Sequence, residues 1–205
     1  MSSAAIRLVL ADDQALVRGA LSALLGLEPD LDVVAEVGTG AEAVSVATVE
    51  QPDVVLMDVE MPGMDGIEAC AAVRAASPRT RVLIVTTFGR PGYLRRALQA
   101  GASGFVVKDT PASQLADAVR RVHRGLRVVD PALATDSLVS GESPLTARET
   151  DVLRAARDGS SVAAIASRLF LSEGTVRNHL SGAIGKTGAG NRAEAVLVAE
   201  GNGWL

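Results

Sequence analysis

Five short apolar runs alternate with five helical patterns, and this alternation constrains the fold more than any other feature of the sequence. The runs cover residues 6–11, 31–37, 54–57, 81–87 and 104–108, and the helical patterns cover residues 14–27, 41–50, 65–76, 91–100 and 111–124. Short apolar strands that alternate strictly with helices are typical of a parallel sheet with helices on both faces. We therefore predict an α/β domain over residues 1–124, built on a five-stranded doubly wound parallel sheet.

The pattern changes after residue 124. Residues 125–143 have no clean period and several turn formers, so we expect a linker with room for a short helix around residues 131–139. Residues 144–205 contain four helical segments, at about 146–157, 161–168, 173–186 and 190–200, and no strand-like run. Each begins at a residue that commonly caps helices: Thr146 (with Glu149 in a capping box), Ser161, Ser172 and Asn191. We therefore expect a second, all-helical domain.

Composition narrows the class of protein. Hydrophobic residues make up 48% of the 205-residue chain, which is enough for a sizeable core. The net charge is −4, so any contact with nucleic acid has to come from a local patch. The single cysteine, Cys70, lies in an apolar helical pattern and is expected to be a core residue. No apolar run approaches the ~20 residues of a membrane span, so we expect a soluble, cytoplasmic protein.

Acidic residues follow two strands that should be neighbours in a doubly wound sheet. Asp12 and Asp13 end the first strand, and Asp58 ends the third. Three converging carboxylates repel one another and require a cation, and oxygen ligands favour Mg²⁺. Thr86 ends the fourth strand and Lys108 ends the fifth, at the same edge. A carboxylate, a cation, an ammonium and a hydroxyl around one point match the needs of phosphoryl transfer.

The second domain contains a helix, a short turn at residues 170–172 and another helix, which is a helix-turn-helix. On its second helix, Val176, Leu180 and Ile184 recur every four residues and should face the core. The side chains expected on exposed faces, within reach of phosphates and base edges, are Thr175, Arg177, Asn178 and Ser181. Residues 144–205 carry seven Arg or Lys and six Asp or Glu, a net charge of 7 − 6 = +1. A single copy should therefore bind DNA weakly, and two copies on adjacent half-sites would bind more tightly.

Residues 5–124 resemble the receiver domain of two-component response regulators. The resemblance rests on Asp12-Asp13, Asp58, Thr86 and Lys108 at strand ends, and on the local sequence of residues 57–66. It implies a flavodoxin-like fold in which Asp58 accepts a phosphoryl group from a sensor histidine kinase. It implies direct Mg²⁺ ligation by Asp13, Asp58 and the Glu60 backbone carbonyl, with Asp12 acting through a water. It further implies that Lys108 pairs with the phosphoryl group, that Thr86 hydrogen-bonds it and moves inward, and that Phe105 rotates with Thr86.

Residues 144–196 resemble the LuxR-type DNA-binding domain, joined to a receiver as in the NarL/FixJ family. The matching positions are Leu145-Thr146, Arg148-Glu149, Val152-Leu153, Ile165-Ala166, Ser172-Glu173, Thr175-Val176, His179 and Lys186. His179 and Lys186 join the expected DNA contacts, and His179 fits a structural or phosphate-contacting role better than a metal site. Departures from the family pattern occur at residues 162–164 and 187–188. The apolar helix at residues 193–199 could close the core or form a dimer contact.

These resemblances imply a DNA-binding transcriptional regulator that phosphorylation activates. It would not be an enzyme beyond self-phosphorylation and slow autodephosphorylation at Asp58, and its receivers would pair through residues 14–27 and 111–124. The alternative is a DNA-binding or docking protein that works without phosphorylation. A haloacid-dehalogenase-type phosphatase is disfavoured, because that class needs a second aspartate where this chain has Glu60.

Overall fold

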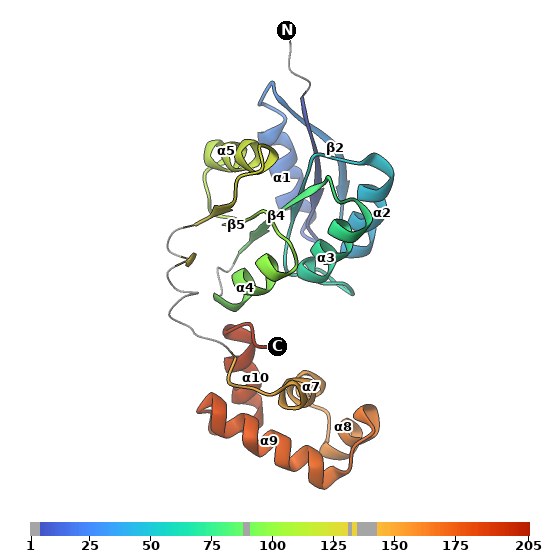
Figure 1. The fold of residues 1–205 in the computed structure, drawn as a ribbon, viewed down its shortest axis with the longest axis vertical. Helices are drawn as coiled ribbons and strands as arrows, with labels where there is room; N and C mark the ends of the chain where they lie inside the picture. The colour runs from blue at the N-terminus through green and yellow to red at the C-terminus, as the bar shows by residue number, and fades with distance from the viewer. Residues whose placement is uncertain (1–4, 88–90, 131–132, 135–142) are drawn as a thin grey trace. The chain divides into compact units, whose positions relative to one another are not determined.

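The computed structural model describes residues 5–87, 91–130, 133–134 and 143–205 (Figure 1). The chain divides into two compact units with a boundary near residues 135 and 136. The short helix expected around residues 131–139 falls largely outside the described residues. None of the helices in the described ranges combines the length and the apolar character that a membrane span requires.

The first unit is built on a parallel sheet with the strand order β2-β1-β3-β4-β5-β6. The strands are β1 (Ile6–Ala11), β2 (Leu31–Val37), β3 (Val54–Met57), β4 (Arg81–Thr86), β5 (Gly104–Val107) and β6 (Val128–Val129). The doubly wound topology and the five predicted strands are confirmed. The sheet has one more strand than predicted, because β6 lies in the segment expected to be a linker. Its two residues pair with Gly104 and Phe105, and two residues are too few to show a period in the sequence.

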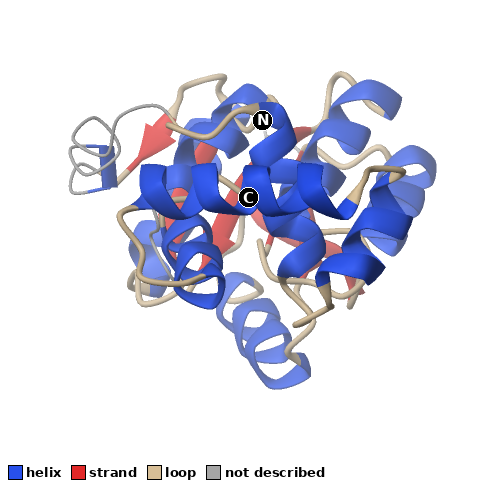
Figure 2. Cartoon of the chain, turned by 90° about the horizontal axis from the view of Figure 1, so that it is seen from below, coloured by secondary structure: helices blue, strands red, loops and turns tan. Residues whose placement is uncertain are grey.

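Helices cover both faces of this sheet (Figures 1 and 2). They are α1 (Ala15–Leu25), α2 (Gly40–Glu50), α3 (Gly66–Ala76), α4 (Pro91–Gln99) and α5 (Ala112–His123). Leu25 of α1 and Leu115, Val119 and Val122 of α5 pack on one face, and α2, α3 and α4 pack on the other. Cys70 of α3 is fully buried in this second layer, as predicted, and burial raises the pKa of its thiol to about 12.

The second unit contains α7 (Ala147–Ala156), α8 (Val162–Leu169), α9 (Glu173–Thr187) and α10 (Arg192–Gly201). The four predicted caps are confirmed, because Thr146, Ser161, Ser172 and Asn191 each accept a hydrogen bond from a backbone N–H in the first turn that follows. A compact apolar core joins the four helices. Its largest buried members are Leu153, Ile165, Leu180 and Leu205, together with Val152, Val176 and Val196. The buried face of α10 therefore closes the core, while its Leu197 is 68% exposed.

Candidate functional site

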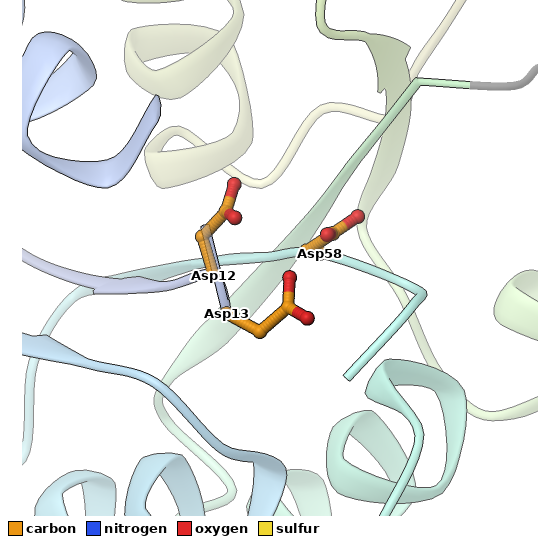
Figure 3. A group of neighbouring side chains, drawn as sticks. All are labelled: Asp12, Asp13 and Asp58. Carbon is orange, nitrogen blue, oxygen red and sulfur yellow. The ribbon is translucent and has the colours of Figure 1, made fainter. Parts of the chain in front are cut away.

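Three carboxylates meet at the carboxyl-terminal edge of the sheet. Asp12 and Asp13 follow β1, and Asp58 follows β3, the strand paired beside it. The register of Ala11 with Met57 brings the two strand ends level, and the Asp58 N–H donates to the Ala11 carbonyl at 2.8 Å. One oxygen from each carboxylate lies within 4.8 Å of the others (Figure 3). The structure thus brings together the three acidic residues that the sequence places at strand ends.

Lys108 bridges two of these carboxylates. It follows β5, and its Nζ lies 2.7 Å from Asp12 Oδ2 and 2.8 Å from Asp58 Oδ2. Burial raises the pKa of the Asp58 carboxyl, although the hydrogen bond and charge of Lys108 oppose this. Burial works to lower the pKa of the Lys108 ammonium, but its hydrogen bonds to Asp12 and Asp58 outweigh burial and raise it. Lys108 therefore stays charged and supplies an internal counter-charge to the cluster.

The remaining carboxylate oxygens differ in their hydrogen-bond donors and in their exposure to solvent. Asp58 Oδ1 accepts the Val59 N–H at 2.7 Å, and Asp12 Oδ1 accepts the Gln14 N–H at 2.9 Å. Both side chains belong to buried residues, whereas Asp13 is exposed. Asp13 therefore presents its carboxylate to solvent beside two oriented neighbours. This all-oxygen set of donors suits a hard cation that retains waters, which is the coordination that Mg²⁺ prefers.

Gly66 allows α3 to begin directly against the end of β3. A Cβ at this position would lie 1.7 Å from the Asp58 carbonyl oxygen, so only glycine fits. The Gly66 N–H donates to the Val59 carbonyl at 2.9 Å. Asp65 caps the helix by accepting the N–H groups of Ile67 and Glu68. The backbone that carries Asp58 is therefore fixed by the first turn of a helix.

The other residues expected at this site occupy different depths. Thr86 ends β4 and is buried, and its carbonyl accepts the Lys108 N–H at 2.7 Å. Phe105 lies inside β5 and is fully buried among the apolar residues under the sheet. Glu60 has an exposed side chain in the loop after Asp58. Thr86 and Lys108 thus share the edge with the acidic cluster, while Phe105 belongs to the core behind it.

The sequence patterns did not predict the role of Arg18, whose side chain holds the backbone at Asp12 and Asp13 in place. Its Nη1 donates to the Asp12 carbonyl at 2.5 Å, and its Nε lies 3.8 Å from Glu36 Oε2. Arg18 comes from the first turns of α1, so it ties this helix and the end of β2 to the peptide between Asp12 and Asp13. An arginine six residues after an aspartate gives no local signal for this contact, because its partner is a backbone carbonyl.

In the second unit, α9 offers a polar surface next to the helix-turn-helix turn. Arg177, Asn178 and Ser181 are exposed, whereas Thr175 and His179 are half-buried. Arg177 pairs with Glu173 one turn earlier at 2.6 Å, and the Thr175 and Ser172 hydroxyls lie 2.8 Å apart. These are the positions from which the second helix of such a motif reaches bases and phosphates.

Lys186 differs from the other residues expected to contact DNA. Its Nζ lies 2.7 Å from Glu149 Oε2, on the first turn of α7. Burial works to raise the pKa of the Glu149 carboxyl, but its hydrogen bonds with Lys186 and Thr146 outweigh burial and lower it.

Both units match known families. Residues 8–120 match the model of the response regulator receiver domain, and residues 143–199 match that of the bacterial regulatory proteins of the LuxR family. The uncharacterized transcriptional regulatory protein YvfU of Bacillus subtilis is 43% identical over 200 residues, which cover 98% of this chain and 100% of that protein. The transcriptional regulatory protein DesR of the same organism is 42% identical, with 98% and 99% covered.

A solved structure shows the same likeness. The response regulator ChrA of a heme-sensing two-component system is 36% identical to this chain and superposes with a TM-score of 0.59. The match covers 97% of this chain and 98% of ChrA, so it extends over both units.

Proposed function

The chain belongs to the two-component response regulators that join a receiver domain to a LuxR-type DNA-binding domain, and on that premise we propose that phosphorylation of Asp58 activates it. It is a transcriptional regulator and not a classical enzyme. The proposal depends above all on one observation. Asp58 is buried at the end of β3, with Lys108 Nζ at 2.8 Å and with Asp12 and Asp13 in the same cluster.

The cluster of Asp12, Asp13 and Asp58 is typical of the magnesium site of receiver domains. We propose Asp13, Asp58 and the Glu60 backbone carbonyl as direct ligands, with Asp12 acting through a water. The exposure of Asp13 supports its place as a direct ligand, because its carboxylate faces solvent beside the two buried carboxylates. When bound, the ion would neutralise the carboxylates and the oxygens of an incoming phosphoryl group.

The reaction is a transfer from a phosphohistidine of a sensor histidine kinase. A carboxylate oxygen of Asp58 attacks phosphorus and forms the new P–O bond, while the P–N bond to the imidazole breaks and its electron pair returns to nitrogen. Lys108 takes up charge on the phosphoryl oxygens, and Thr86 donates a hydrogen bond to one of them. Phe105 would respond to the inward movement of Thr86 from within the core. Self-phosphorylation by small phosphodonors and slow hydrolysis at Asp58 are the only chemistry expected.

We propose that α9 reads DNA in the major groove. Thr175, Arg177, Asn178, Ser181 and His179 are its contact residues, whereas the Lys186 ammonium is paired with Glu149. The net charge of +1 over residues 144–205 supports binding as a homodimer formed on phosphorylation. Receiver pairing would use α1 and α5, and the chain would act in the cytoplasm.

The test compares the parent chain with Asp58→Ala, using acetyl phosphate and Mg²⁺ as the donor system. The parent should gain one phosphoryl group by intact mass, and the variant should gain none. Oligomeric size and affinity for a selected duplex are then measured with and without the donor. Equal labelling of the variant would refute the site, and labelling of the parent without any change in size or affinity would favour the phosphorylation-independent alternative.

A further inference from the structure

Glu149 joins the start of α7 to the last turn of α9. Only 9% of its side chain is exposed. Its Oε2 accepts the Thr146 N–H at 2.7 Å, which completes the capping box of α7, and also accepts Lys186 Nζ at 2.7 Å. A single carboxylate oxygen therefore connects a helix cap to the helix that carries the proposed DNA contacts.

Gly182 makes room for this carboxylate on α9. It lies one turn before Lys186, and a Cβ there would approach Glu149 Oε1 to 2.6 Å. One carboxylate oxygen thus binds the ammonium, while the other rests against a helix surface that lacks a side chain. This fit specifies both the rotation of α9 about its axis and its distance from α7.

Lys186 and Arg177, both on α9, form different kinds of ion pair. Arg177 is 62% exposed along its side chain and pairs with Glu173, a residue of its own helix. Lys186 is 39% exposed and pairs with a largely buried carboxylate on another helix. Loss of the Lys186 ammonium would leave the largely buried Glu149 carboxylate without its cation, which favours keeping the pair formed.

We infer that Lys186 is a positioning residue, which sets the recognition helix through Glu149 instead of contacting a DNA phosphate. The inference rests on the proposed role of α9 in binding DNA. It assigns Lys186 to positioning this helix, whereas the sequence predicts that Lys186 contacts DNA. If Lys186 acts in this way, its loss misaligns side chains such as Asn178 and Ser181 relative to base edges. It leaves the number of phosphate contacts unchanged.

The experiment uses the full chain and four variants: Lys186→Met, Glu149→Gln, the double variant, and Lys186→Arg as the conservative replacement. Arg157→Met is the matched control, because Arg157 forms a comparable ion pair with Glu200 at 2.7 Å that does not involve α9. Two fluorescein-labelled duplexes of equal length serve as probes. One is enriched by the parent chain from a random pool, and the other has mixed sequence. Anisotropy is measured over a salt series, at a temperature where Trp204 fluorescence shows every variant to be folded.

We expect Lys186→Met to weaken binding of the enriched duplex about tenfold, the loss that one misaligned base contact produces. Binding of the mixed-sequence duplex and the slope of log affinity against log salt should stay unchanged. The effect should disappear in the Glu149→Gln background, because the two residues act as one unit. Lys186→Arg should restore most of the discrimination, and Arg157→Met should bind both duplexes like the parent.

Two results would overturn the inference. A phosphate contact would weaken both duplexes equally, make the salt slope shallower by about 0.9, and persist in the Glu149→Gln background. A role in stability alone would lower the melting temperature while leaving both affinities at the parent values. A parent chain that enriches no duplex would instead refute the proposed role of α9, and the inference with it.

Discussion

Replacing Gly66 with alanine should separate α3 from the end of β3. The new Cβ would lie 1.7 Å from the Asp58 carbonyl oxygen and 2.8 Å from its carbonyl carbon. Cβ contacts under 3.0 Å essentially never occur, so the helix or the strand must move by at least the 1.3 Å between 3.0 and 1.7 Å. Both partners are backbone, and a side-chain rotation cannot relieve the contact.

The expected cost is about 3 kcal/mol, the upper end for overpacking at a rigid site. Gly19→Ala is the matched control, since Gly19 is an exposed glycine inside α1 and its Cβ would meet nothing within 4 Å. That substitution should stabilise the receiver by up to about 1 kcal/mol through helix propensity alone. The same chemical change is therefore expected to have opposite signs at two helical glycines.

Urea unfolding is followed by far-UV circular dichroism, which records the helices of both units, and the receiver transition is the one that Trp204 fluorescence does not report. The single tryptophan, Trp204, packs against the core of the second unit, so its fluorescence follows that unit and should not change. Where the strand end moves by this 1.3 Å or more, the displacement of Asp58 should also slow labelling by acetyl phosphate at least roughly 100-fold. A Gly66→Ala receiver that unfolds at the parent urea concentration, or that is labelled at the parent rate, would refute this account of the site.

Three further outcomes are expected. Lys108→Met leaves the acidic cluster without its ammonium, so added Mg²⁺ should raise the melting temperature of the variant by more than it raises that of the parent. An equal increase in both proteins would contradict the bridging role of Lys108. Phe170 is 95% exposed and has a left-handed backbone with φ of 55°. Phe170→Gly should therefore stabilise the second unit by up to about 1 kcal/mol in unfolding monitored by Trp204 fluorescence. A loss of stability would argue against backbone strain at this position. Burial opposes ionisation of Glu149, yet its hydrogen bonds with Lys186 and Thr146 lower its folded-state pKa. Its stabilisation is therefore complete above the ordinary carboxyl pKa and is lost as the pH falls through the folded value, and Glu149→Gln should remove this part of the acid sensitivity of the second unit.

The parts of the fold that follow from local pattern were predictable. The five main strands and the four caps of the second unit lie where periodicity and capping chemistry place them. The convergence of Asp12 and Asp58 also followed, because parallel strands bring their carboxyl ends to one edge.

What the sequence did not reveal depends on long-range contacts. Strand β6 exists because Val128 and Val129 pair beside β5, and a two-residue run has no period of its own. Arg18 donates to the Asp12 backbone carbonyl. Every residue has such a carbonyl, so the residue types in the sequence do not indicate this contact. The ion pair of Lys186 with Glu149 joins residues 37 positions apart, so no local pattern in the sequence indicates it.

The Lys108 ammonium between Asp12 and Asp58 also keeps the net charge of the acidic cluster small. Three carboxylates and one ammonium leave two negative charges, which a divalent cation would cancel. Replacing the charge of Asp58 with a dianionic phosphoryl group then adds only about one negative charge. A change of that size is screened within about 8–10 Å at physiological salt. If Asp58 is phosphorylated as proposed, a partner beyond that distance would therefore respond to a displacement of packed elements more than to the electric field of the pocket.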